Sequence, residues 1–375
     1  MTTERGLYVH FPYCRRKCAY CDFNSGVASD AERHLYLQAL AAEIAQSPPL
    51  PISTVYFGGG TPTLYEAQEL AGVLEALRGH FAIAADAEIT VEANPGTVAL
   101  ASLRLLRQAG FNRLSLGVQS LDDTELRLLG RVHTSTEARE AIAAARESGF
   151  DNLSLDLMRG LPGQTASQWE SVLTQAVALS PNHLSVYGLI LEPDTPLREQ
   201  VEAGLLPTPE EEDAADWIRW TVDALAEAGY ERYEISNYAQ PGHRCRHNLL
   251  YWRDGEYVGL GAGAVSYLSG ERRRNLVKAT DYLAAALEQR GLVADSERLD
   301  PDTACGEAVM LGLRTTEGIA PQELTRRFGV DLRQRHKDLI ARLVAGGLML
   351  DDGVRLRLTF EGMLVQSAIA CEFLP

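Results

Sequence analysis

Residues 8–23 read YVHFPYCRRKCAYCDF, and the cysteines in this stretch decide how the chain is interpreted. Cys14, Cys18 and Cys21 are separated by three and then two residues, whereas the remaining cysteines stand singly at Cys245, Cys305 and Cys371. A disulfide framework would spread its cysteines more evenly, and a zinc site usually draws four ligands from two separated pairs. Three thiolates on one short loop can instead hold three corners of a 4Fe–4S cube and leave the fourth iron open. The triplet therefore predicts an iron–sulfur cluster.

Around this stretch, the first two-thirds of the chain alternate between short apolar runs and amphipathic helical patterns. The apolar runs predict strands at 6–11, 54–58, 88–92, 113–118, 152–157 and 183–189. The stretches between them predict helices at 32–46, 67–77, 102–109, 136–147 and 167–178. Repeated strand–helix units indicate a parallel sheet, and strands that are apolar on both faces fit a barrel covered by helices. Because six units are fewer than the eight of a complete barrel, we expect an α/β fold with a partial (β/α)6 barrel.

The last third of the chain has a different pattern. A helix is predicted at 210–228 and a strand near 233–236, followed by a Gly-rich region at 255–263. Helical patterns at 303–314, 321–328 and 332–345 then precede an alternating run at 354–358. Helices followed by a ribbon are the outline of a winged-helix module, so we expect a small α+β, winged-helix-like carboxy-terminal domain. The predicted division is 1–240 for the barrel, 241–295 for a connecting region and 296–375 for the terminal domain.

The charge of the chain argues against nucleic acid as a partner. The formal net charge is −16, and residues 297–375 contain 10 Lys or Arg against 12 Asp or Glu. The attraction to phosphates that supports DNA binding by a winged helix is therefore missing. The chain also has no apolar run of the roughly 20 residues that cross a bilayer, and its start lacks the pattern of a secretion signal. We expect a cytoplasmic protein and leave peripheral contact with a membrane open.

Polar residues follow several of the predicted strands. The run Gly58–Gly59–Gly60–Thr61 follows the second strand, Glu92 ends the third, and Gln119 and Asp156 come at the ends of later ones. Because the carboxyl ends of parallel strands meet at one mouth, we expect these residues to share a binding site. Glycines let the backbone approach a ligand closely, and a carboxylate can accept hydrogen bonds from hydroxyl or ammonium groups. Arg131 can pair with a ligand carboxylate.

The cysteine spacing is the signature of the radical S-adenosylmethionine superfamily, which the chain resembles. In that superfamily the amino and carboxylate groups of S-adenosylmethionine chelate the open iron, and its reductive cleavage supplies a 5′-deoxyadenosyl radical. The stretch from Tyr8 to Cys14 further resembles the oxygen-independent coproporphyrinogen dehydrogenase (HemN) group. The resemblance implies that Cys14, Cys18 and Cys21 ligate the 4Fe–4S cluster. It also implies that S-adenosylmethionine is bound by Tyr8, Gly59, Gly60, Thr61, Glu92, Gln119, Arg131 and Asp156.

Three features bring the chain nearer to a second group of this family, the HemW heme chaperones. The dehydrogenase pattern continues the triplet as Cys-x-Cys, whereas Phe23 stands at that position here. The dehydrogenases also carry a long amino-terminal extension, whereas 13 residues precede Cys14. Residues 247–252, HNLLYW, match the HNxxYW motif associated with heme in the HemW group.

This motif implies a heme site. His247 would supply the imidazole as an axial ligand, and Tyr251 and Trp252 would offer apolar faces for the porphyrin. His243 and Cys245 lie close by in the sequence and compete with His247 as ligands.

The resemblance therefore implies a heme chaperone, which binds heme and transfers it to acceptor proteins, with respiratory enzymes at the membrane as the expected acceptors. The cluster and S-adenosylmethionine would serve this transfer or the formation of a homodimer, and the oligomeric state is left open. The alternative is a radical coproporphyrinogen III dehydrogenase, in which hydrogen abstraction from propionate side chains precedes decarboxylation. A third interpretation is a radical enzyme that acts on heme itself. The features above favour a binding protein over an enzyme.

Overall fold

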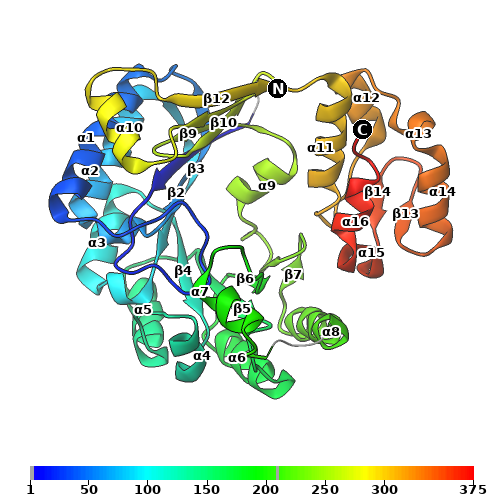
Figure 1. Ribbon diagram of the computed structural model, residues 1–375, viewed down its shortest axis with the longest axis horizontal. Helices are drawn as coiled ribbons and strands as arrows, with labels where there is room; N and C mark the ends of the chain where they lie inside the picture. Colours follow the sequence, from blue (N-terminus) through cyan, green and yellow to red (C-terminus); the bar gives the residue numbers. More distant parts are fainter. Residues whose placement is uncertain (1–3, 208–210) are drawn as a thin grey trace.

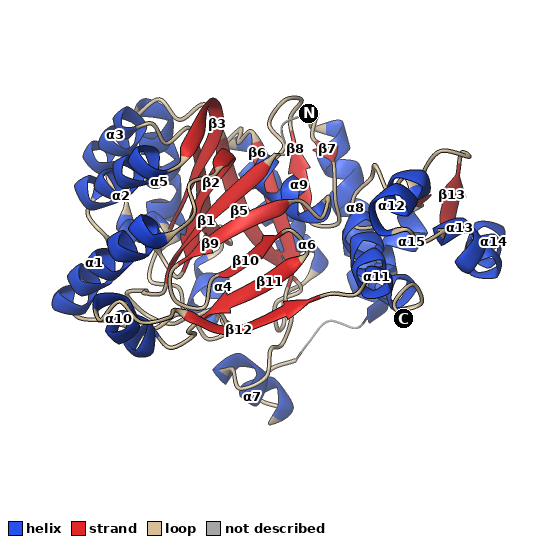
Figure 2. Ribbon diagram, turned by 90° about the horizontal axis from the view of Figure 1, so that it is seen from above, coloured by secondary structure: helices blue, strands red, loops and turns tan. Residues whose placement is uncertain are grey.

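The computed structural model describes residues 4–207 and 211–375, and a twelve-stranded sheet dominates it. The strands run in the order β12-β11-β10-β9-β1-β2-β3-β4-β5-β6-β8-β7. The seven neighbouring strands from β9 to β6 are parallel, and the strands at both ends are antiparallel. The sheet fans through the larger part of the molecule and does not close on itself, since β12 and β7 form its two edges (Figure 2).

Six parallel strands and the helices between them form the partial barrel, which confirms the predicted fold class. The strands are β1 (Arg5–Phe11), β2 (Pro51–Gly59), β3 (Ala82–Ala93), β4 (Arg113–Gln119), β5 (Leu153–Arg159) and β6 (His183–Gly188). The helices are α1 (Asp30–Gln46), α2 (Ala67–His80), α3 (Leu100–Ala109), α4 (Asp123–Leu128), α5 (Ser135–Glu147) and α6 (Ala166–Ala178), with short 3-10 turns η1 (Pro62–Leu64) and η2 (Pro95–Thr97). These helices cover the outer face of the sheet (Figure 1).

Alternation along each strand decides which side chains meet the helices. In β2, Val55 and Phe57 are fully buried in the apolar core between sheet and helices. Thr54 and Tyr56 project to the opposite face, because successive side chains of a strand point to opposite sides. The inner face of the barrel therefore carries polar and aromatic groups, and it is this face that lines the site.

Residues 241–298 continue the same sheet with strands that the sequence did not predict. They are β9 (Glu256–Leu260), which pairs in parallel with β1, and the antiparallel β10 (Val265–Leu268), β11 (Glu271–Asn275) and β12 (Val293–Arg298). Helices α9 (Arg246–Trp252) and α10 (Ala279–Leu287) belong to the same segment. β11 reads ERRRN and lacks an apolar alternation. Its charges are balanced by the neighbouring strand, where Arg272 pairs with Glu297 and Arg274 with Asp295.

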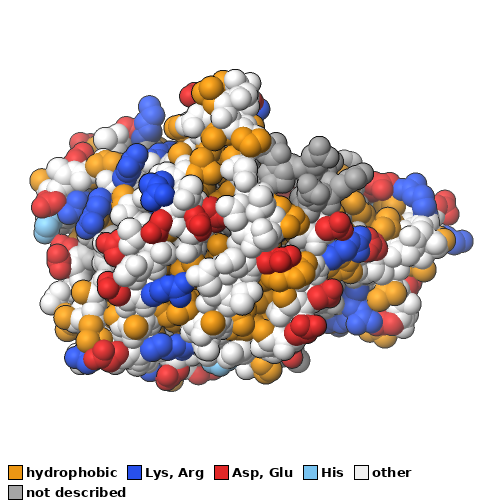
Figure 3. Space-filling view, turned by 90° about the horizontal axis from the view of Figure 1, so that it is seen from below, with side chains coloured by type: hydrophobic (Ala, Val, Ile, Leu, Met, Phe, Trp, Pro, Cys, Tyr) orange, Lys and Arg blue, Asp and Glu red, His pale blue; other side chains and the backbone are white. Residues whose placement is uncertain are grey.

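The segment between β6 and α9 differs from the prediction in one respect. It contains α7 (Pro196–Glu202), α8 (Glu211–Glu227), β7 (Glu231–Arg232) and β8 (Asn237–Ala239). The predicted strand at 233–236 is wrong, because these residues form the turn between β7 and β8. There the Glu234 carboxylate accepts hydrogen bonds from the backbone of Ser236 and the side chain of Asn237. The predicted first residue of the helix, 210, lies outside the described residues. α7 projects from the body of the molecule, and apolar side chains gather on this projection (Figure 3).

The carboxy-terminal unit is a small α+β module, as predicted. Its elements are α11 (Pro301–Gly312), α12 (Pro321–Phe328), α13 (Leu332–Arg335), α14 (Lys337–Ala345), β13 (Met349–Asp351), β14 (Leu356–Leu358), α15 (Phe360–Leu364) and α16 (Gln366–Cys371). The single helix predicted at 332–345 is wrong. It breaks at His336, whose backbone leaves the helical region (φ −109°, ψ 28°) and whose ring packs on Phe373.

The barrel and the carboxy-terminal unit have separate apolar cores and stand beside each other (Figure 1). Across residues 4–207 and 211–375, no helix is both long and apolar enough to cross a bilayer.

Candidate functional site

The three cysteines line one pocket at the carboxyl ends of the parallel strands. Its volume is about 410 Å³. The structure brings seven of the residues predicted from the resemblance to the same pocket, which are Gly59, Gly60, Thr61, Glu92, Gln119, Arg131 and Asp156. Exposed apolar side chains stand at its mouth, with Phe23 64% and Ile190 69% exposed. We call this space the cysteine pocket.

The glycine run after β2 holds the loop that carries the cysteines. Gly60 donates its backbone N–H to Phe11 (2.7 Å), and Thr61 donates to the carbonyl of Tyr13 (2.9 Å). A Cβ on Gly60 would lie 2.7 Å from the Tyr13 oxygen and 2.9 Å from that of Phe11. The absence of a side chain at Gly60 is therefore required by the backbone of the cysteine loop, whereas the sequence suggested a requirement set by the ligand.

Two polar side chains reach the cysteines. The Thr61 hydroxyl donates to Cys14 Sγ at 3.4 Å, and Arg131 Nη1 donates to Cys18 Sγ at 3.5 Å. Burial raises the pKa of the Cys14 thiol, which the Thr61 hydrogen bond offsets in part, and burial also raises the pKa of Cys21. Without a bound cation these two groups therefore favour the neutral thiol, and a metal would be needed to stabilise them as thiolates.

The opposite wall of the cysteine pocket is acidic. Glu92 accepts hydrogen bonds from the Tyr56 hydroxyl (2.7 Å) and the Gly59 N–H (3.3 Å), and burial raises its pKa to about 7. Burial also raises the pKa of Asp156, which accepts from Ser115 at 3.1 Å. Carboxylates that are desolvated yet aimed into a pocket are suited to bind hydroxyl or ammonium groups of a ligand.

Gln119 stands at the end of β4 with φ 66°, in the left-handed region that side chains other than glycine rarely adopt. Such strained positions cluster at functional sites.

Tyr8 lies apart from the cysteines. Its hydroxyl is 3.1 Å from His10 Nδ1, and its ring lines two neighbouring pockets. Burial, and then the charge of Glu92, raises the pKa of Tyr8 well above its usual range, so the hydroxyl stays protonated. Its contact with S-adenosylmethionine stays a prediction.

His247 is held inside the barrel. It is 1% exposed, with Nδ1 2.8 Å from the Thr54 hydroxyl and Nε2 2.9 Å from the Tyr251 hydroxyl. Burial, and then the charge of Arg113, lowers the pKa of His247 to about 3. The ring is therefore neutral at pH 7, which is the form that binds a metal. Both nitrogens already have partners, so ligation of a heme iron by Nε2 requires the loss of the Tyr251 contact.

The competing cysteine in this segment is less accessible still. Cys245 is fully buried, its Sγ lies 3.6 Å from Glu88, and burial raises its pKa to about 12.

Three pockets adjoin one another from the cysteines to the carboxy-terminal unit. A second pocket of about 320 Å³ shares Glu92 and Tyr187 with the cysteine pocket. A third pocket of about 470 Å³ shares Tyr8, Tyr251 and Trp252 with the second.

Two further residues belong to the site: the sequence places Asn94 among the polar residues at the strand ends without giving it a role, and sequence reasoning missed Tyr56. Asn94 donates to the Thr61 hydroxyl (2.8 Å) and accepts from Arg131, so it joins two predicted residues. Tyr56 bonds Glu92 and stacks on the His247 ring at a centroid distance of 5.0 Å. Asn94 follows a strand directly and carried the same signal as Glu92, whereas the role of Tyr56 depends on the tertiary packing.

Fold and site together define a radical S-adenosylmethionine protein. Residues 8–176 match the Radical SAM superfamily, and residues 299–365 match the HemN C-terminal domain. The solved structure of coproporphyrinogen III oxidase (HemN) from Escherichia coli aligns with a TM-score of 0.87 and 25% identity, over 99% of this chain and 90% of that one.

Relatives of similar sequence narrow the assignment from the superfamily to one family within it. The chain is 42% identical over 328 residues to the heme chaperone HemW of Synechocystis sp., covering 84% of this chain and 79% of the relative. It is 34% identical over 375 residues to the heme chaperone HemW of Bacillus subtilis, covering 99% of each. The chain belongs to the HemW family.

Membership of the superfamily implies a 4Fe–4S cluster and S-adenosylmethionine, which supplies an adenosyl radical upon reduction. The donor set fits both, because three thiols line one wall and carboxylate, amide and guanidinium groups line the others. Arg131 Nε is buried without a partner among the described residues. No three His, Cys, Asp or Glu side chains of the described part of the chain are arranged to hold a single metal ion. Ligation by the three cysteines therefore stays a prediction.

Proposed function

We propose that the protein is a heme chaperone that binds heme and transfers it to acceptor proteins. The observation that carries this proposal is the position of Tyr251 and Trp252, which line both the second and the third pocket. Aromatic rings of this kind are suited to the flat, apolar faces of a porphyrin. Relatives named heme chaperone HemW that align along most of the chain support the same function.

The cysteine pocket would hold the resident cofactors. Cys14, Cys18 and Cys21 would ligate the 4Fe–4S cluster, with Arg131 beside Cys18. The glycines after β2, Thr61, Gln119 and Asp156 would surround S-adenosylmethionine, with Glu92 accepting hydrogen bonds from its ribose hydroxyls or its ammonium group.

His247 would ligate the heme iron after Tyr251 releases Nε2. The acceptors would be respiratory proteins, met in the cytoplasm or at the membrane surface, and a homodimer would bring two such sites together. Nucleic acid is not a proposed partner, given the net charge of −16.

A heme titration tests the proposal. Purified protein titrated with hemin should develop a saturable Soret band, and His247→Gln should weaken or shift that band if the imidazole ligates iron. A wild-type protein without saturable heme binding would end the chaperone interpretation.

The similarity to HemN over 99% of the chain favours one second candidate, coproporphyrinogen III dehydrogenase. Anaerobic incubation of reconstituted protein with coproporphyrinogen, S-adenosylmethionine and a reductant separates the two. A chaperone leaves the substrate unchanged, whereas the appearance of protoporphyrinogen would establish the enzyme.

A further inference from the structure

The largest of the three adjoining pockets lies between the barrel and the carboxy-terminal unit. We infer that this space, here called the aromatic pocket, holds the tetrapyrrole ring, and the inference rests on the proposed function. His247 lines the second pocket and contacts the Tyr251 hydroxyl, so its Nε2 would reach an iron in the aromatic pocket only after Tyr251 turns away. Its barrel side is lined by five aromatic side chains: Tyr8, Tyr251, Trp252, Tyr257 and Tyr267. Its other side is lined by Met310 and Leu311 of α11.

The aromatic wall is ordered by mutual packing. The Tyr251 and Tyr257 rings meet edge to face at a centroid distance of 4.7 Å, and Tyr257 and Tyr267 lie 6.4 Å apart. One face of Trp252 is covered by the Arg314 guanidinium at 4.4 Å. A rigid wall of rings opposite the flexible, apolar side chains of Met310 and Leu311 is suited to a flat ligand, because stacking needs planar surfaces and little reordering. The volume of about 470 Å³ lies within the range of ligand sites.

Polar groups gather on the same pocket lining. Arg272 bonds Glu297 at 2.7 Å and also bonds Glu307. A guanidinium binds carboxylates through paired hydrogen bonds, so a ligand carboxylate can replace Glu307 at Arg272, against the repulsion of Glu307 and Asp254, which also line the pocket. The porphyrin carboxylates would therefore lie toward Arg272.

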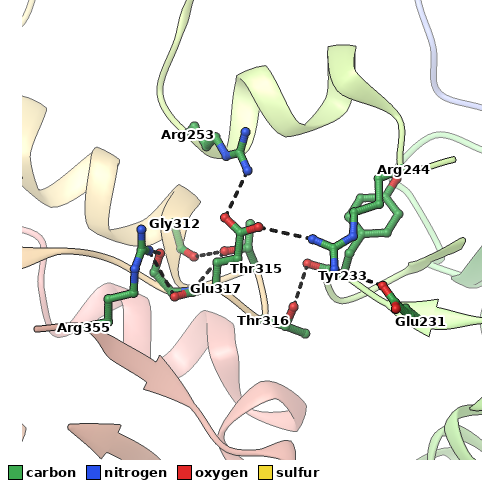
Figure 4. A network of polar contacts seen from close by, with 10 residues as sticks. Glu231, Tyr233, Arg244, Arg253, Gly312, Thr315, Thr316, Glu317 and Arg355 are labelled. Carbon is green, nitrogen blue, oxygen red and sulfur yellow. Dashed lines mark hydrogen bonds and ion pairs between the residues drawn. The ribbon is translucent and has the colours of Figure 1, made fainter. Parts of the chain in front are cut away.

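The carboxy-terminal side of the pocket is joined to the barrel by ion pairs rather than by a shared apolar core. Glu317 pairs with Arg244 (3.2 Å) and Arg253 (3.0 Å), which flank α9 on either side (Figure 4). Thr316 donates to the Tyr233 carbonyl in the same joint (Figure 4). Interfaces of this polar kind permit relative motion of two units, so Met310 and Leu311 can withdraw to admit or release a large ligand.

Filling the pocket from the carboxy-terminal side tests the assignment without touching the barrel. Leu311→Trp and Met310→Trp add an indole to the pocket, whereas Leu350→Trp places the same group at a residue that is 52% exposed on β13. Hemin and metal-free protoporphyrin IX are the probes, because the second reports binding of the ring without an axial bond. Iron content and far-UV circular dichroism check that each variant is folded and reconstituted.

We expect Leu311→Trp and Met310→Trp each to weaken both probes about tenfold or more, with Leu350→Trp like the wild type and iron content unchanged in all three. Wild-type affinity in both pocket-filling variants would overturn the site while leaving the chaperone function standing. Weaker probe binding in Phe23→Ala instead would place the ring at the mouth of the cysteine pocket and overturn its assignment to the aromatic pocket. If the wild type bound neither probe, the proposed function would fail together with the site.

Discussion

A single methyl group at Gly60 should displace the loop that carries the cysteines. Gly60 does not have a positive φ, so an alanine meets no backbone strain there and acts through contact alone. Its Cβ would stand 2.7 Å from the Tyr13 oxygen and 2.9 Å from the Phe11 oxygen. Carbon and oxygen normally approach to about 3.3 Å, so the loop must move by about 0.5 Å.

The loss of stability in Gly60→Ala follows from these contacts. Overpacking of this kind costs about 1–3 kcal/mol, and weakening one of the two backbone hydrogen bonds at Gly60 and Thr61 adds about 1 kcal/mol. The smaller conformational entropy of alanine in the unfolded chain returns about 0.5–1 kcal/mol. The net loss in the free energy of unfolding of Gly60→Ala is therefore about 1–3 kcal/mol.

Urea unfolding of the unreconstituted protein measures this loss, and iron and sulfide per chain after anaerobic reconstitution measure the geometry of the cysteine loop. Gly72→Ala is the matched control, since Gly72 is exposed in α2 and no atom lies within 4 Å of its added Cβ. It should gain about 0.5–1 kcal/mol, because alanine is the better helix former, and keep its iron. Gly60→Ala with wild-type stability and full iron would refute the reasoning.

Burial raises the pKa of Glu92 to about 7, and the ionised form accepts stronger, charge-assisted hydrogen bonds from a ligand than the neutral acid does. Calorimetry should therefore find S-adenosylmethionine affinity rising from about pH 6 to about pH 8 in the wild type, and a flat profile in Glu92→Gln; a parallel rise in both would exclude this carboxyl. Gln119→Gly relieves about 1 kcal/mol of left-handed strain, so thermal unfolding should show stability equal to or above the wild type while cofactor affinity falls; unchanged affinity would remove Gln119 from the site. Glu317→Gln breaks the ion pairs with Arg244 and Arg253 at a cost of about 1 kcal/mol. Hydrogen exchange should then quicken at this joint with iron content unchanged, and exchange rates like those of the wild type would show that the pairs do not hold the two units together.

The barrel could be predicted from the sequence because its apolar residues follow a local period. Apolar residues that alternate with others, such as Val55 and Phe57, predict a strand. β11 escaped prediction because its stability comes from partners in β12, among them Glu297 and Asp295, which no local period reveals. The helix break at His336 comes with a ring contact to Phe373, far along the chain, which no local pattern reveals either.

The site followed the same division. That Glu92 and Gln119 line one pocket was predictable, because the ends of parallel strands meet at one mouth. The buried, hydrogen-bonded state of His247 could not be predicted. Its two hydrogen bonds are made by Thr54 of β2 and by Tyr251 in the next turn of α9. A motif can name the residue at a site, whereas the neighbours that decide its accessibility come from other parts of the fold.

The two free edges of the sheet have a consequence for how a ligand reaches the interior. A closed barrel can be entered only at its two ends, through an opening no wider than the ring of strands. Here the sheet stops at β12 and at β7, and α9 and the carboxy-terminal unit stand beside the space between its ends (Figure 1). The pocket lined by Tyr257, Tyr267 and Leu311 lies between the strands near one of these edges and the carboxy-terminal unit, so a broad, flat ligand bound there would not occupy the strand ends that carry the cysteines.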